Sequence, residues 1–158
     1  ANDSGQITEI PIIDMERLSS STAIDSDSEV EKLDLACKEC GFFQLVNHGI
    51  DPSLLDRVKS EIQDFFNLPM EDKKKMWQNP NEMEGFGQAF VLSEDQKLDW
   101  ADLFFVIVQP VHLRKPHLFP KLPLPFRDTL EMYSAEVKNI AKNLIAKMAK
   151  TLQVKPEE

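Results

Sequence analysis

The sequence is poor in cysteine and has no long apolar run. Two cysteines among 158 residues are too few for a disulfide framework, which argues against the class of small secreted disulfide-bonded domains. No segment approaches the roughly 18 apolar residues of a membrane-spanning helix. The polar N-terminal residues lack the pattern of a signal peptide. These absences predict a cytoplasmic protein with no membrane partner.

Positive charge is also scarce, since Lys plus Arg total 18 against 27 for Asp plus Glu, a net charge of −9. An acidic surface repels phosphate groups, so nucleic acid is not an expected partner. With 42% hydrophobic and 28% charged residues, the composition is typical of a soluble globular protein. The length is sufficient for one domain with its own core.

Local patterns predict an α+β fold, in which helices are accompanied by a few short strands. Residues 7–13 predict a strand that Pro11 restricts to a sheet edge. The polar residues 19–28 predict a loop, and Ser28 is the expected N-cap of a helix over 29–40.

The segment 36–50, ACKECGFFQLVNHGI, predicts a helix end, a strand and a tight turn. Gly41 suits the left-handed position that ends a helix. Residues 42–46 are apolar enough for a strand that is buried on both faces. Asn47 and Gly49 tolerate the positive φ of a turn.

The rest of the chain predicts three further helices and another strand. Asp51 is the expected cap of an amphipathic helix. Residues 71–77 predict a short charged helix, whose lysines at 73–75 are expected on a solvated face. Residues 102–108 predict a strand that is apolar on both faces. Apolar residues at a spacing of three to four over 123–152 predict one long C-terminal helix.

Few side chains are suited to catalysis. The histidines are His48, His112 and His117. His48 lies in a predicted turn, and the other two lie in a proline-rich segment at 109–125, so we predict structural or surface roles for all three. Cys37 and Cys40 form a C-x-x-C at a predicted helix C-terminus, where the helix dipole does not favour a thiolate. We interpret both as buried structural cysteines, with a redox pair as a weaker alternative. We predict no catalytic, cofactor-binding or metal-binding residue.

Six short motifs are spread along the chain. They are IPIIDM at 10–15, GFF running into NHG at 41–49, FFNLPMEDKKK at 65–75, EGFGQAF at 84–90, DWADLFF at 99–105 and LRKPHLFPKLP at 113–123. The second resembles the N-terminal region of plant 2-oxoglutarate/Fe(II)-dependent oxygenases. The last three resemble, within that family, the senescence-related subgroup and the poppy alkaloid O-demethylases.

The resemblance implies that residues 1–158 are the N-terminal domain of an oxygenase whose catalytic jelly-roll (double-stranded β-helix) core is absent from this chain. The strands would join the jelly-roll sheet. The full-length family uses Fe(II) and 2-oxoglutarate, with ascorbate, to hydroxylate or demethylate a small plant specialised metabolite. Its His-x-Asp, distant His and Arg-x-Ser are not in this sequence. We therefore expect this chain alone to be inactive and to bind neither Fe(II) nor 2-oxoglutarate.

The resemblance also suggests candidate substrate contacts. In the family the strand at 102–108 borders the substrate cavity, so Leu103 and Phe105, which share a face of that strand, are expected to line it. Ordinary core packing is the alternative for both. Phe86 lies between two glycines ahead of a possible strand at 88–92. This segment either approaches the substrate or only forms a turn.

The two ends of the sequence suggest a fragment. Ala1 is not an initiator methionine, and Lys155 to Glu158 has the pattern of a helix start. The expected partner is the rest of the oxygenase chain, and the small-molecule substrate is the expected ligand of the intact enzyme. The alternative is a truncated, stand-alone gene product that serves as a non-catalytic binding or regulatory module.

Overall fold

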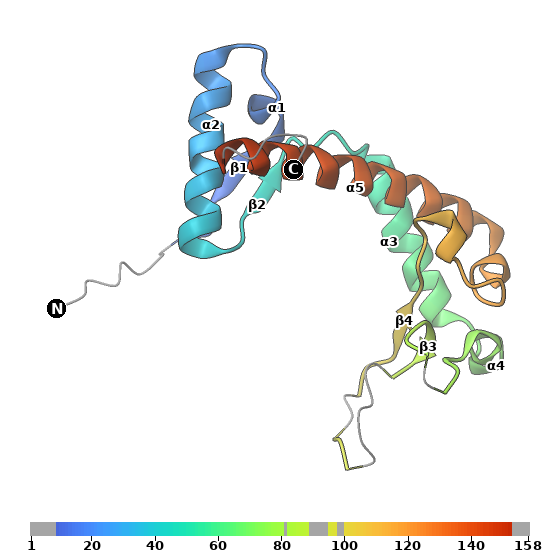
Figure 1. Ribbon diagram of the computed structural model, residues 1–158. Helices are drawn as coiled ribbons and strands as arrows, with labels where there is room; N and C mark the ends of the chain where they lie inside the picture. The colour runs from blue at the N-terminus through green and yellow to red at the C-terminus, as the bar shows by residue number, and fades with distance from the viewer. Residues whose placement is uncertain (1–8, 81, 89–94, 98–99, 153–158) are drawn as a thin grey trace. The chain divides into compact units, whose positions relative to one another are not determined.

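The computed structural model describes residues 9–80, 82–88, 95–97 and 100–152 (Figure 1). The chain divides into two compact units, one formed by Ala1–Ile50 with Val137–Glu158 and the other by Asp51–Glu136. The long helix α5 (Leu124–Thr151) begins in the second unit and ends in the first. The predicted mixture of helices, few strands and a long C-terminal helix is confirmed.

In the first unit, two short strands pair side by side (Figure 1). Strand β1 (Ile12–Asp14) begins directly after Pro11 and runs parallel to β2 (Gln44–Val46), with Ile13 opposite Leu45. Helices α1 (Met15–Leu18) and α2 (Ala23–Leu35) connect the two strands. The core of this unit consists of Ile13, Met15, Leu18, Leu33 and Ala36, with Leu144 and Met148 of α5 packed against it.

The predicted loop at 19–28 is confirmed only for residues 19–22, and the Ser28 cap is wrong, because α2 begins at Ala23 with Thr22 as its N-cap. The Thr22 hydroxyl donates to the carboxylate of Asp25 at 2.9 Å. Acidic side chains are favourable in the first turn of a helix. Most of the polar residues that suggested a loop, 23–28, therefore form the first turns of a helix.

Glycine and asparagine make the predicted turns after α2. A π-helical turn (Ala36–Cys40) ends at Gly41, whose φ is 76°, and Asn47 and Gly49 have φ of 51° and 81°. Burial of the following strand on both faces is wrong. Phe43 and Leu45 pack on the core, but Phe42 and Gln44 are exposed, because the described residues cover this sheet on one face.

The second unit begins with α3 (Pro52–Asn67). Its predicted cap is confirmed, since the Asp51 carboxylate accepts from the Ser53 N–H at 2.8 Å. Helix α4 (Met70–Lys73) and a 3-10 turn (Lys74–Met76) follow. The core of the unit consists of Phe65, Met76, Phe86, Val108, Leu118, Phe119, Leu122 and Phe126.

A second two-stranded sheet contributes Phe86 to this core and packs Phe104 against it. Strands β3 (Gly85–Gly87) and β4 (Leu103–Phe105) are antiparallel, with Phe86 opposite Phe104. The β4 strand is shorter than the predicted strand at 102–108. Of the possible strand at 88–92, residues 89–92 lie outside the described residues.

The backbone path of strand β3 depends on its first residue, Gly85. Its φ is 129°, and a Cβ added there would lie 2.7 Å from the Cα of Gln78. The N–H of Gln78 donates to the Phe86 carbonyl at 2.9 Å. Glycine alone permits this φ together with so close an approach of the backbone.

The prediction of a solvated lysine face holds for Lys74 and Lys75 and is wrong for Lys73. Lys73 is buried, and its ammonium donates to the Phe66 carbonyl at 2.9 Å at the end of α3. The ammonium also lies 5.2 Å from the centre of the Phe86 ring. A helix C-terminus carries partial negative charge, so Lys73 joins α4 to α3 and is not displayed to solvent.

Candidate functional site

Strand β4 presents different side chains to its two faces. Phe104 packs against the core, with its ring centroid 4.6 Å from that of Phe65. Leu103 and Phe105 lie on the opposite face and are 38% and 39% exposed. The strand therefore has one face supported by aromatic packing and one apolar face that is partly open. This open face is the candidate site.

The structure does not bring Phe86 together with Leu103 and Phe105. Phe86 is fully buried, and its ring lies 6.4 Å from Phe65 and 5.9 Å from Trp77. Directly opposite residues of an antiparallel pair point to the same face, so Phe86 shares the core face with Phe104. Only the register between β3 and β4 reveals this placement.

Two charged residues that the sequence analysis did not single out hold the chain after β4. The Glu84 carboxylate accepts from the Ile107 N–H at 2.8 Å. The Arg114 Nε donates to the Val108 carbonyl at 2.7 Å. Both residues lie in motifs that carry the family resemblance, at 84–90 and 113–123. Neither belongs to a recognisable catalytic pattern, so sequence alone provides no signal for this particular role.

The histidines occupy the predicted structural or surface positions. The Nδ1 of His48 accepts from the Ile50 N–H at 3.2 Å inside the turn. His112 is exposed, and the Nε2 of His117 lies 3.3 Å from the Asn79 amide. Among the described residues, no group of three or more His, Cys, Asp or Glu side chains is arranged to hold a metal ion. This part of the chain therefore does not fit an Fe(II) centre.

Both cysteines are free, and burial of the pair is wrong for Cys37, which is exposed, whereas Cys40 is half-buried. In a regular helix Cys37 would follow Leu33 on the buried face. The π-helical turn at Ala36–Cys40 widens the backbone and changes that phase. The C-x-x-C is thus a surface feature of a helix end.

The first two sequence motifs meet at Asp14. One carboxylate oxygen accepts from the N–H groups of Glu16 and Arg17 at 3.0 and 3.2 Å and caps α1, and the other accepts from the Asn47 amide at 2.8 Å. The bonds from Arg17 and Asn47 hold the pKa of Asp14 below its usual value. The Asp14 N–H donates to buried Glu29 at 2.9 Å. These motif residues are therefore structural.

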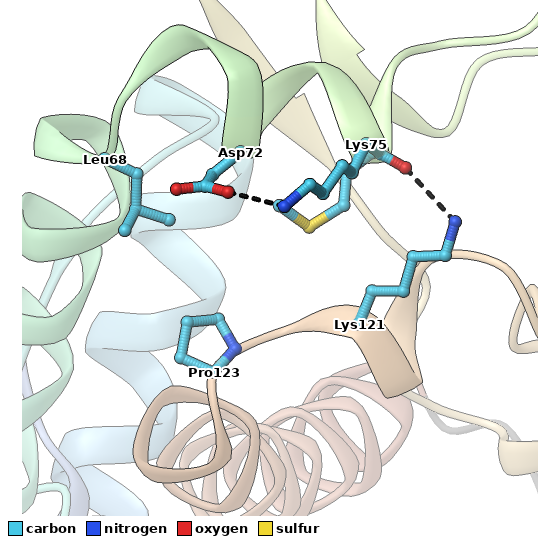
Figure 2. Close-up of a pocket in the computed structure, with 6 residues that line it drawn as sticks. Leu68, Asp72, Lys75, Lys121 and Pro123 are labelled. Carbon is cyan, nitrogen blue, oxygen red and sulfur yellow. Dashed lines mark hydrogen bonds and ion pairs between the residues drawn. The ribbon is translucent and has the colours of Figure 1, made fainter.

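A separate cavity of about 490 Å³ lies beside α4 (Figure 2). Its lysines engage neighbouring groups, since Lys75 pairs with Asp72 at 2.6 Å and Lys121 donates to the Lys75 carbonyl at 3.3 Å. Asp72 raises the pKa of Lys75. The other lining residues are Leu68, Met76 and Pro123. None of the predicted substrate contacts lies here, so the cavity is distinct from the open face of β4.

Among the residues that the structure describes, no helix combines the length and apolar character needed to cross a membrane.

Comparison with known proteins connects these features to one family. The family described as "non-haem dioxygenase in morphine synthesis N-terminal" matches residues 10–122. "Protein SRG1" of Arabidopsis thaliana is 81% identical over 150 residues, 95% of this chain and 41% of that protein. "Thebaine 6-O-demethylase" of Papaver somniferum is 56% identical over 149 residues, 94% of this chain and 41% of that protein.

Solved structures agree in fold. The crystal structure of JOX2 in complex with 2OG, Fe and JA matches with a TM-score of 0.76 and 31% identity, over 92% of this chain and 41% of that one. A rice dioxygenase for auxin oxidation matches with a TM-score of 0.71 at 21% identity, over 94% of this chain and 47% of that one, which shows the fold alone. The chain spans about two fifths of the length of the curated relatives named above.

Proposed function

Because the chain belongs to the family of non-haem dioxygenase N-terminal regions, we propose that it works as the N-terminal part of a 2-oxoglutarate/Fe(II)-dependent oxygenase. The match over residues 10–122 carries this proposal. The resemblance to senescence-related proteins and poppy demethylases, which the sequence motifs suggested, agrees with the relatives found. The proposed reaction is hydroxylation or demethylation of a small plant specialised metabolite.

The chemistry is assigned to a catalytic jelly-roll part beyond this chain. Fe(II) and 2-oxoglutarate, with ascorbate, would serve that part, because the described residues here supply no set of metal ligands. Two free cysteines suit a reducing compartment, and we place the protein in the cytoplasm. The role left to this chain is to build structure and to shape the substrate site.

We assign the open face of β4 to the substrate wall. Leu103 and Phe105 would contact the metabolite through apolar surface, since pockets for small molecules are lined mostly by apolar and aromatic side chains. Phe104 and Phe86 support these residues from the core face. Phe86 thereby acts behind the wall and not on its surface.

Two exposed apolar residues of the first unit suggest where the jelly-roll part would pack. Ile12 on β1 and Phe42 beside β2 are 54% and 57% exposed. Short strands with open edges pair readily with further strands. We propose that the strands of this chain extend the jelly-roll sheet.

A hybrid enzyme tests the proposed function. In it, this chain replaces the corresponding N-terminal two fifths of thebaine 6-O-demethylase, and turnover of thebaine and 2-oxoglutarate is measured. We expect an active hybrid whose KM for thebaine differs from that of the parent, while its KM for 2-oxoglutarate is unchanged. A stable, monomeric hybrid without turnover would contradict the proposal.

Two substitutions in the hybrid separate the wall from ordinary packing. Phe105→Ala is expected to raise the KM for thebaine more than the KM for 2-oxoglutarate, because the side chain faces the substrate and not the iron ligands. Leu103→Ala is compared with Leu113→Ala, a matched leucine that is 51% exposed on a 3-10 turn. Equal effects of the two leucine variants would favour core packing at Leu103.

A stand-alone non-catalytic module is the second candidate, because each unit of the chain has a buried core of its own. Sedimentation and thermal unfolding of the 158-residue chain distinguish the two. As part of a larger enzyme, the chain should associate or be marginally stable, since its apolar surface lacks cover. A monodisperse monomer that unfolds cooperatively above about 60 °C would favour the module.

A further inference from the structure

The backbone beyond β4 is held by charged side chains in place of a neighbouring strand. The ladder between β3 and β4 ends at the pair Gly85 and Phe105. Two residues further on, the N–H of Ile107 donates to the carboxylate of Glu84, which directly precedes β3. The carbonyl of the following residue, Val108, accepts from the guanidinium of Arg114. Two successive residues are thus fixed by side chains that come from different segments.

Further contacts hold the side chains of Glu84 and Arg114 beside the backbone that follows β4. Glu84 is 5% exposed, and a buried carboxylate is unfavourable unless it is hydrogen-bonded. Arg114 also donates from Nη1 to Glu131 on α5, and its guanidinium lies 4.2 Å from the centre of the Phe119 ring. Charge-assisted hydrogen bonds are stronger and more directional than neutral ones. Arg114 therefore links the exit of β4 to α5 within the second unit.

We propose that Glu84 and Arg114 are positioning residues, which set the path of the chain after β4 and thereby hold Leu103 and Phe105 in place. The inference rests on the proposed substrate-wall function of β4. A three-residue strand has few ladder bonds of its own, so its orientation depends on how its continuation is anchored. The bond from Ile107 to Glu84 and the bond from Val108 to Arg114 supply that anchor. Neither side chain has to touch the substrate.

The anchor itself is tested in the folded hybrid enzyme, without any assumption about which residues contact the substrate. Glu84→Met removes the acceptor at similar side-chain length, whereas Glu84→Gln retains an acceptor oxygen. Amide hydrogen exchange, read by NMR, should be about tenfold or more faster at Ile107 in Glu84→Met and close to the unsubstituted chain in Glu84→Gln. Glu136→Met, on an exposed glutamate of α5, is the matched control. Unchanged exchange at Ile107 in folded Glu84→Met would overturn the inference.

The functional consequence is tested in the hybrid enzyme. Glu84→Met and Arg114→Lys should each raise the KM for thebaine about tenfold, with kcat and the KM for 2-oxoglutarate nearly unchanged, because a displaced wall loosens substrate contacts and leaves the iron ligands intact. Glu84→Gln should restore the KM. Lysine keeps the charge at 114 but cannot bond Val108 and Glu131 through one planar fork.

The two measurements separate the inference from the function on which it rests. Faster exchange at Ile107 with an unchanged KM for thebaine would overturn the wall assignment, and the positioning role with it. A general loss of kcat in all three variants would overturn the positioning role in favour of simple structural damage. If Glu84→Met does not fold, the KM for thebaine of Arg114→Lys is compared with that of Glu84→Gln. A raised KM in Arg114→Lys alone supports the positioning role, and equal KM values overturn it.

Discussion

Replacement of Phe65 by alanine tests the core that supports β4. Phe65 lies on α3 and is 2% exposed. Its ring centroid lies 4.6 Å from that of Phe104 on β4 and 5.6 Å from that of Phe126 near the start of α5. The side chain therefore joins three elements of the second unit, and its truncation leaves a cavity between them.

The magnitude follows from this burial. Truncation of a buried phenylalanine to alanine lowers the free energy of unfolding by about 3–5 kcal/mol. Favourable ring pairs add about 0.5–1.5 kcal/mol each beyond the area that they bury, and Phe65 also pairs edge-on with Phe66 and Phe86. We expect a loss in the upper half of that range. A natural domain is stable by only about 5–15 kcal/mol, so this single change removes a large part of the total.

Urea unfolding at 25 °C, followed by far-UV circular dichroism, measures the effect. Phe105→Ala is the matched control, because it is the same substitution in the same unit at a side chain that is 39% exposed. Its partial burial corresponds to a loss of about 1–2 kcal/mol. If both variants shift the midpoint equally, the claim that Phe65 organises this core is refuted. The control also shows whether Phe105→Ala is folded well enough for the kinetic test.

Four further outcomes are expected. Gly85→Ala should lower the free energy of unfolding by at least about 2 kcal/mol, because it places a side chain at positive φ and against the backbone of Gln78. A thermal midpoint within about 1 °C of that of the parent would contradict this. Lys73→Met should lower it by about 1–3 kcal/mol through the bond lost at the end of α3, and an unchanged urea midpoint would show that the buried ammonium contributes nothing. The pKa values of Asp14 and Asp51 are lowered by N–H donors at helix starts. The stability that these carboxylates contribute is therefore complete above the unfolded pKa of about 3.9 and is lost as the pH falls through the lower folded pKa. An NMR titration that finds either carboxyl at or above its unfolded pKa would refute this prediction. The chain alone should not bind Fe(II) tightly. Anaerobic calorimetry with Mn(II) tests this, and a stoichiometric micromolar site involving His48 would overturn the structural role of that residue.

Several features follow from local sequence because their causes are local. Asp51 before Pro52 caps α3, Gly41 ends the helix before β2, and Asn47 adopts the positive φ of the turn. Each depends on the backbone preference or short side chain of one or two residues. The long helix over Leu124–Thr151 is similarly determined by one sustained apolar spacing. The family, too, was recognisable from short motifs whose residues mostly have such structural roles.

Only the tertiary structure decided which side chains are buried. Alternation within β4 was enough to place Leu103 and Phe105 on one face, but the register with β3 was needed to place Phe86 on the other. Lys73 looked like its exposed neighbours, Lys74 and Lys75, until the end of α3 and the Phe86 ring were brought next to it.

The same reason hides the anchor of β4 from the sequence. Glu84 and Ile107 are 23 residues apart, and Arg114 and Glu131 are 17 residues apart. Local preferences act over three or four residues. The sequence by itself therefore determined the cap of α3, the glycine that ends the helix before β2, the turns and the family. Long-range pairing decided burial and the residues that hold the candidate site in place.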